Sequence, residues 1–102
     1  MIKIEVPETI KIGGYDYSIE ASAELNKELN ATSRYADSND CLRRIRLSTD
    51  TSEQQTSNDF IHECLHQVDS VYNGPSLSEN NVKQLANGLH QIFEQLGIRF
   101  VR

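Results

Sequence analysis

Residues 60–72 read FIHECLHQVDSVY, and their apolar side chains recur at the three- and four-residue spacing of an amphipathic helix. Ser52, with Gln55 three residues later, has the form of a capping box, so this helix is expected to begin just after Ser52. Gly74-Pro75 ends it, because glycine and proline together stop a helix. The sequence therefore predicts a long helix in the second half of the chain.

A second helix is expected to follow the first. Ser78 is a typical N-cap residue, and Gly97 is a good residue for the end of a helix. Between them the apolar residues keep helical spacing and are predicted to form one buried stripe: Val82, Leu85, Ala86, Leu89, Ile92, Phe93 and Leu96. Residues 98–101 are then expected to add a short final strand.

The beginning of the chain alternates between apolar and polar residues, which is the period of a half-buried β-strand. Residues 2–6 show this alternation, with Ile2, Ile4 and Val6 on one face. Two further alternating runs, residues 10–12 and 15–19, flank Gly13-Gly14 and predict a hairpin.

The region between the hairpin and the long helix gives weaker signals. Residues 21–31 are predicted to form a short helix, and a further strand pair is expected to flank Ser38-Asn39-Asp40, over residues 33–36 and 42–47. No internal repeat or linker divides the chain. We therefore expect one domain, residues 1–102, of the α+β class, in which a small antiparallel sheet is followed by two core helices.

Length and composition limit the possible functions. The 102 residues are enough for one core, and 37% of them are hydrophobic. The net charge of -5 and the scattered basic residues argue against a nucleic-acid partner. The sequence shows no signal peptide that would indicate secretion. It also has no apolar run of roughly 18 residues that would indicate a membrane span. Two cysteines make no disulfide framework, so we expect a cytoplasmic protein without a membrane partner.

The run His62-Glu63-Cys64-Leu65-His66 is the feature with the clearest chemistry. Histidines four residues apart differ by only about 40° around a helix, so both imidazoles can reach one ion. Zn²⁺ accepts nitrogen ligands at about 2.0–2.1 Å, and Glu63 lies where it can take a proton from an activated water. Such a motif also arises by chance. The supported helix and the adjoining apolar face favour a zinc site here.

The sequence also resembles a family of small phage- and prophage-encoded proteins. These share a glycine-rich hairpin, a His-Glu-x-x-His helix and a Leu-Ser-Glu segment that opens a Leu-Ala-Asn-Gly-Leu helix. The corresponding pieces here are Gly13-Gly14, residues 61–66, Leu77-Ser78-Glu79 and residues 85–89. Such proteins look like minimal relatives of the gluzincin peptidases, including the ImmA/IrrE type. The resemblance implies a zincin-like domain, Zn²⁺ as the cofactor and Glu79 as the third zinc ligand.

One position departs from that family. Many gluzincins carry an acidic residue four positions after the glutamate ligand, and this chain has Lys83 there. Asp69 is the candidate to orient the histidines instead, since it follows His62 by seven residues and lies within about 20° of it around the helix. A ligand histidine usually donates its second N–H to a carboxylate or carbonyl. A direct ligand role for Asp69, in place of Glu79, is the alternative.

His90 is the remaining histidine of the chain. It follows Glu79 by eleven residues, which returns it to nearly the same face of the helix but roughly 16 Å along the axis. One ion can hardly be bound by both residues. His90 is therefore either a partly buried histidine or a cleft residue that stabilises an oxyanion.

Hydrolysis of a peptide bond in a peptide or protein substrate is the leading functional prediction. Glu63 is the expected general base, and His62, His66 and Glu79 are the expected zinc ligands. The alternative is a non-catalytic, zinc-stabilised module of phage origin that binds a protein. The presence of Glu63 favours the interpretation as an enzyme over the binding module, since a structural metal site needs no base. Hydrolysis of a non-peptide substrate is a third possibility, because a fold resemblance does not separate these functions.

Overall fold

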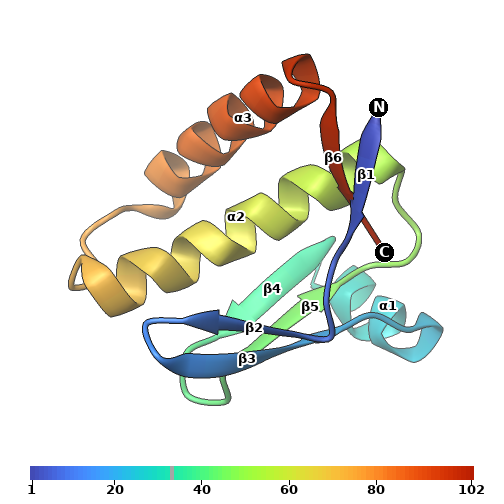
Figure 1. The fold of residues 1–102 in the computed structure, drawn as a ribbon. Helices are drawn as coiled ribbons and strands as arrows, with labels where there is room; N and C mark the ends of the chain where they lie inside the picture. The colour runs from blue at the N-terminus through green and yellow to red at the C-terminus, as the bar shows by residue number, and fades with distance from the viewer. Residues whose placement is uncertain (33) are drawn as a thin grey trace.

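Six strands and three helices make up the computed structural model, which describes residues 1–32 and 34–102 (Figure 1). The strands are β1 (Ile2–Glu5), β2 (Thr9–Ile12), β3 (Tyr15–Glu20), β4 (Ala36–Asn39), β5 (Arg44–Leu47) and β6 (Ile98–Val101). The helices are α1 (Ala23–Ala31), α2 (Glu53–Tyr72) and α3 (Glu79–Gln95). The α+β class predicted from the sequence is confirmed.

The larger sheet has the strand order β2-β3-β5-β4. Its two hairpins, β2–β3 and β4–β5, are antiparallel as expected, but β3 and β5 run parallel. The expectation of a purely antiparallel sheet is therefore corrected to a mixed one. Parallel neighbours need a long connection between them, and here α1 and β4 supply it. The two chain ends, β1 and β6, form a separate parallel pair.

The turn between β4 and β5 comes later than the sequence predicted. Ser38 and Asn39 lie within β4, and the side-chain Oδ1 of Asn39 accepts a hydrogen bond from the backbone N–H of Leu42 at 2.9 Å. Arg43 completes the turn with a φ of 50°. Ser33, the expected first residue of this strand pair, lies outside the described residues. The shift places Ser38 opposite α2.

The predicted ends of the two long helices are confirmed. Ser52 Oγ accepts a hydrogen bond from the backbone N–H of Gln55 at 3.1 Å, and Ser78 Oγ accepts one from Asn81 at 3.1 Å. Beyond α3, Gly97 adopts a φ of 77°, which glycine reaches without a steric penalty. Local capping chemistry thus fixes where both helices begin.

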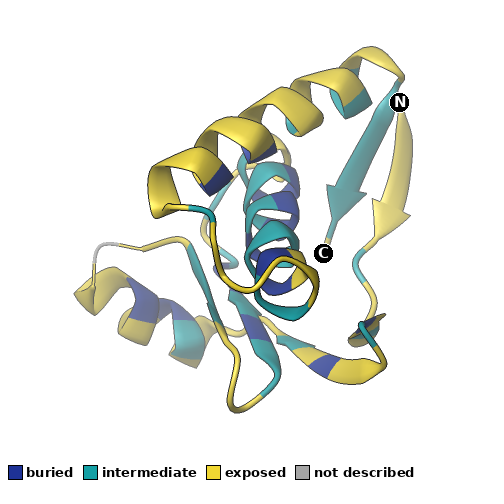
Figure 2. Ribbon diagram, turned by 90° about the vertical axis from the view of Figure 1, so that its left-hand side faces the viewer, coloured by how far each residue is buried: buried dark blue, intermediate teal, exposed yellow. Residues whose placement is uncertain are grey.

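The core lies between the larger sheet and α2. Ile12, Tyr17, Ile45 and Leu47 of the sheet are buried together with Phe60 of α2. The helix α3 packs against α2 on the side away from the larger sheet (Figures 1 and 2). The helix α2, which carries His62 and His66, is consequently the middle layer of the molecule.

The predicted stripe of α3 is buried only in part. Val82 and Ala86 are fully buried against α2. Four of the remaining side chains are exposed: Leu85, Leu89, Ile92 and Leu96. A single helix beneath α3 covers a narrow strip, so an apolar stripe of this width extends beyond it. Among the described residues, no helix is both long and apolar enough to cross a membrane.

Candidate metal centre

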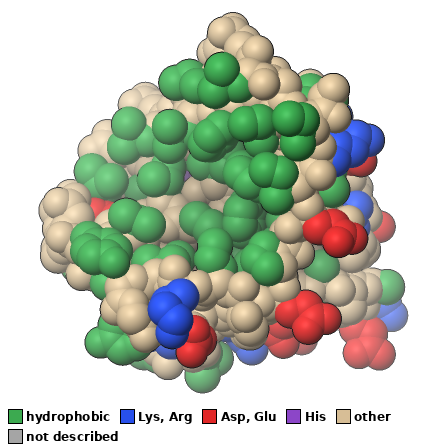
Figure 3. Space-filling model, viewed as in Figure 1, with side chains coloured by type: hydrophobic (Ala, Val, Ile, Leu, Met, Phe, Trp, Pro, Cys, Tyr) green, Lys and Arg blue, Asp and Glu red, His purple; other side chains and the backbone are tan. Residues whose placement is uncertain are grey.

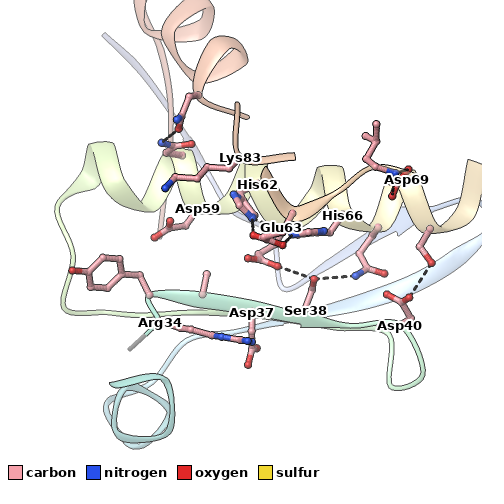
Figure 4. Close-up of a pocket in the computed structure, with 18 of the residues that line it drawn as sticks. Arg34, Asp37, Ser38, Asp40, Asp59, His62, Glu63, His66, Asp69 and Lys83 are labelled. Carbon is pink, nitrogen blue, oxygen red and sulfur yellow. Dashed lines mark hydrogen bonds and ion pairs between the residues drawn. The ribbon is translucent and has the colours of Figure 1, made fainter. Parts of the chain in front are cut away.

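His62 and His66 lie on successive turns of α2 and face the same cleft (Figure 4). Their Nε2 atoms are 3.1 Å apart. Glu79, the first residue of α3, bridges them: its Oε1 lies 2.9 Å from Nε2 of His62 and its Oε2 lies 2.7 Å from Nε2 of His66. The three side chains expected as ligands are thus brought together.

The donor types and spacings of this cluster suit a zinc ion. Ligand atoms about 2.0–2.2 Å from a tetrahedral zinc lie about 3.3–3.6 Å from one another. The separations of 2.7–3.1 Å are slightly shorter, as expected for groups that form hydrogen bonds with one another. Burial lowers the pKa of His62, which favours the neutral imidazole that binds metals.

Asp69 is buried, but its contacts differ from those expected. Its Oδ1 accepts hydrogen bonds from Asn73 Nδ2 at 2.9 Å and from the backbone N–H groups of Ser76 and Leu77 at 3.3 Å. Asp69 is not one of the three clustered ligands, and no described hydrogen bond joins it to either histidine. The expected contact with the histidines is therefore corrected. Asp69 holds the loop between α2 and α3, and this loop positions Glu79.

Glu63 is oriented by a contact that the sequence did not reveal. Its side chain is only 7% exposed, and Oε1 accepts a hydrogen bond from Ser38 Oγ at 2.7 Å. Ser38 in turn accepts one from Gln67 Nε2 at 2.9 Å, so β4 and α2 together fix the carboxylate (Figure 4). Burial, opposed by the Ser38 hydrogen bond, raises the pKa of Glu63 to about 7. A pKa near neutrality suits a group that must accept and then release a proton.

The cluster opens into a cleft of about 1000 Å³ between β4, α2 and the start of α3. Its wall carries more acidic than basic side chains. The acidic ones are Asp37, Asp40, Asp59, Glu63, Asp69 and Glu79, and the basic ones are Arg34 and Lys83. Some of these acids have partners of their own, such as Asp37, which pairs with Arg46.

Asp59 is a cleft residue that the sequence analysis missed. It precedes Glu63 by four residues, so helical spacing alone places it on the same face of α2. Its Oδ1 accepts a hydrogen bond from Gln55 Nε2 at 2.8 Å, and burial raises the pKa of Asp59 to about 6. Ser38 had no such signal, because its position depends on how β4 packs against α2.

His90 does not line the cleft. It is partly buried on α3, and its buried Nδ1 has no hydrogen-bond partner among residues 1–32 and 34–102. Of its two expected roles, the partly buried histidine agrees with this position. Lys83 lines the cleft beside His62 and further disfavours a proton on that imidazole.

Comparisons of the chain with models of protein families, with curated proteins and with solved structures gave no match.

Proposed function

We propose that this protein is a zinc-dependent metallopeptidase of the gluzincin type. The convergence of His62, His66 and Glu79 at the mouth of a cleft carries the proposal, because Glu63 lines the same cleft. Three protein ligands leave a coordination position for water or substrate, as in catalytic zinc sites. A closed structural site has four protein ligands, and only three such side chains cluster in the described residues.

Zn²⁺ bound here supplies Lewis acidity toward a water molecule and a substrate carbonyl. Glu63 takes a proton from the attacking water as the new C–O bond forms, and then donates it to the amine as the C–N bond breaks. Oε1 of Glu63 is held by Ser38, so Oε2 is the oxygen that carries this proton. Ser38 and Gln67 keep the carboxylate in one orientation throughout.

The substrate is an extended peptide that lies along β4. This strand is at the edge of the larger sheet and lines the cleft opposite α2, so its free backbone groups can pair with a peptide backbone. The excess of carboxylates on the cleft wall favours a substrate with lysine or arginine near the cleaved bond.

Replacement of Glu63 by Gln tests the proposal, because Gln keeps the size of the side chain but cannot accept the proton. The zinc-loaded wild type and the variant are incubated with a peptide library, and the products are identified by mass spectrometry. Glu63→Gln should retain zinc and lower cleavage by roughly 10²–10⁴-fold. A wild type that binds zinc but cuts no peptide in the library would overturn the proposal.

A zinc-stabilised binding module is the second candidate. The ligands come from both α2 and α3, so an ion would tie these two helices together even without catalysis. Such a module predicts no turnover in either form and a partner affinity that does not depend on Glu63. The same pair of proteins therefore separates the two functions.

A further inference from the structure

Within the described residues, the strand β1 is paired along one edge only. It runs parallel to β6, and the backbone N–H groups of Ile2 and Val6 donate to Gly97 and Val101 at 2.6 and 2.7 Å. Backbone groups of alternate residues point to opposite sides of a strand, so those of Lys3 and Glu5 point away from β6. In Figure 2 this free edge lies at the outer margin of the molecule.

The apolar side chains of β1 are also uncovered. Ile2 is 63% exposed and Ile4 is 43% exposed, although their alternation with Lys3 and Glu5 is typical of a strand with one buried face. Figure 3 shows hydrophobic side chains gathered over β1, α2 and α3 on one side of the molecule. A free edge beside uncovered isoleucines is typical of a strand that pairs with another chain.

We propose that β1 pairs with β1 of a second copy of this chain, antiparallel and about a two-fold axis at Ile4. Lys3 of one copy then lies opposite Glu5 of the other, and each such pair exchanges two backbone hydrogen bonds. Ile4 lies opposite Ile4 in the non-hydrogen-bonded position, where side chains are closest. The pairing uses the outward-facing backbone groups and leaves the β1–β6 ladder intact.

The charges of β1 favour one register of this pairing, although Lys3 also pairs with Glu53 of its own chain, with Nζ 2.9 Å from Oε1. Only registers that set outward-facing residues opposite each other satisfy the backbone, so the axis must pass through Lys3, Ile4 or Glu5. An axis at Lys3 sets two lysines opposite each other, and an axis at Glu5 sets two glutamates opposite each other, both of which are unfavourable. The axis at Ile4 sets Lys3 of each copy opposite Glu5 of the other, so two pairs of unlike charges face each other. The strand is therefore complementary to itself.

The same register also extends the apolar surface across the axis. Residues directly opposite in an antiparallel pair point to the same face, so Ile2 and Ile4 of both copies share one side of the joined sheet. Ile2 and Ile4 of each copy then have apolar side chains of the other copy as neighbours in place of water. A two-stranded sheet is marginal by itself, and joining two copies gives four strands.

Charge exchange is the first test. Light scattering of the wild type should give twice the chain mass of 11.6 kDa, falling to one chain mass on dilution. Lys3→Glu or Glu5→Lys alone should weaken the dimer by about tenfold or more, and the double exchange should restore it. Lys11→Glu, a change of equal charge in β2, is the control. A monomer at every concentration, or a dimer indifferent to both single exchanges, overturns the proposal.

Cysteine cross-linking tests the register independently of affinity. In a Cys41→Ser background, which removes the exposed native thiol, Ile4→Cys should form a disulfide dimer on mild oxidation. Non-hydrogen-bonded partners have Cα atoms about 4.5 Å apart, within disulfide reach. Ile2→Cys should not cross-link, because its two copies lie about 13 Å apart along the strands. Equal cross-linking of both variants would rule out the proposed register.

Discussion

Ser38 Oγ lies 2.7 Å from Oε1 of Glu63, so a strand residue holds the carboxylate that stands between the two candidate histidine ligands. The contact crosses 25 positions of the sequence. It joins β4, the edge strand of the larger sheet, to α2.

Ser38→Ala should shift the pH dependence of hydrolysis. In the native protein the hydrogen bond from Ser38 lowers the pKa of Glu63. Removing this hydrogen bond therefore raises that pKa. A base with a raised pKa is deprotonated only at higher pH, and the acidic limb of kcat/KM should move to higher pH. Ser70→Ala, which removes a hydroxyl that donates to Asp40 in the same cleft, is the control. An unshifted limb in Ser38→Ala would contradict this role.

Zinc should bind with a stoichiometry of about one ion per chain. The His62→Ala/His66→Ala double variant should bind none, because two of the three ligands are gone. His90→Ala should keep the wild-type content, since His90 lies outside the cleft. Elemental analysis after dialysis measures all three proteins. Equal zinc in the double variant and the wild type would show that the ion binds elsewhere.

Glu79→Gln should mainly lower the affinity for zinc, whereas Asp69→Asn should mainly lower the stability of the metal-free protein. Glu79→Gln removes a ligand, so chelator competition should show a loss of zinc affinity larger than the 10–100-fold typical of outer-shell changes. Asp69→Asn weakens hydrogen bonds to a charged acceptor in the α2–α3 loop, so it should destabilise the metal-free protein by about 1–3 kcal/mol. Denaturant unfolding in chelator measures the second effect. A larger zinc loss in Asp69→Asn than in Glu79→Gln would make Asp69 the ligand.

Asp59 and Glu63 should make the metal-free protein less stable as the pH rises from about 4 to 7, whereas His62, whose pKa burial lowers, contributes in the opposite sense just below pH 6.5. Burial raises the pKa of Asp59 from 3.8 to about 6 and that of Glu63 from 4.5 to about 7. Between these values the two carboxyl groups hold more protons in the folded state than in the unfolded state, so their contribution to stability falls as the pH rises. Asp59→Asn should flatten the part of the decline below about pH 6, whereas the exposed Asp50→Asn should not. Thermal unfolding across this range, in chelator, reveals the slope.

Gly13→Ala should be much more destabilising than Gly14→Ala. Both glycines have positive φ, 61° and 84°, so both substitutions strain the backbone. Of the two, only Gly13 would place a Cβ in collision with another side chain, Cγ1 of Val71 on α2. The free energy of unfolding should fall by about 1–3 kcal/mol more in Gly13→Ala than in Gly14→Ala, which is the usual effect of overpacking. Denaturant unfolding measures this difference. Equal losses would mean that Val71 moves aside freely.

Local chemistry made the helices predictable. Ser52 and Ser78 cap α2 and α3 with their own side chains, and Gly97 accepts the backbone conformation beyond α3, so neighbouring residues suffice to place these boundaries. The spacing of His62 and His66 likewise follows from the helical repeat. These features depend on residues within a few positions of one another.

Packing decided the rest. Ser38 reaches Glu63 only because β4 lies at the sheet edge beneath α2, and Asp69 turns to the loop because Ser76 and Leu77 present their N–H groups there. The parallel pairing of β3 with β5 and the exposure of Ile4 also depend on which segments meet in space. Periodicity indicates that a strand or helix has an apolar face, but only the neighbours present in three dimensions determine whether that face is covered.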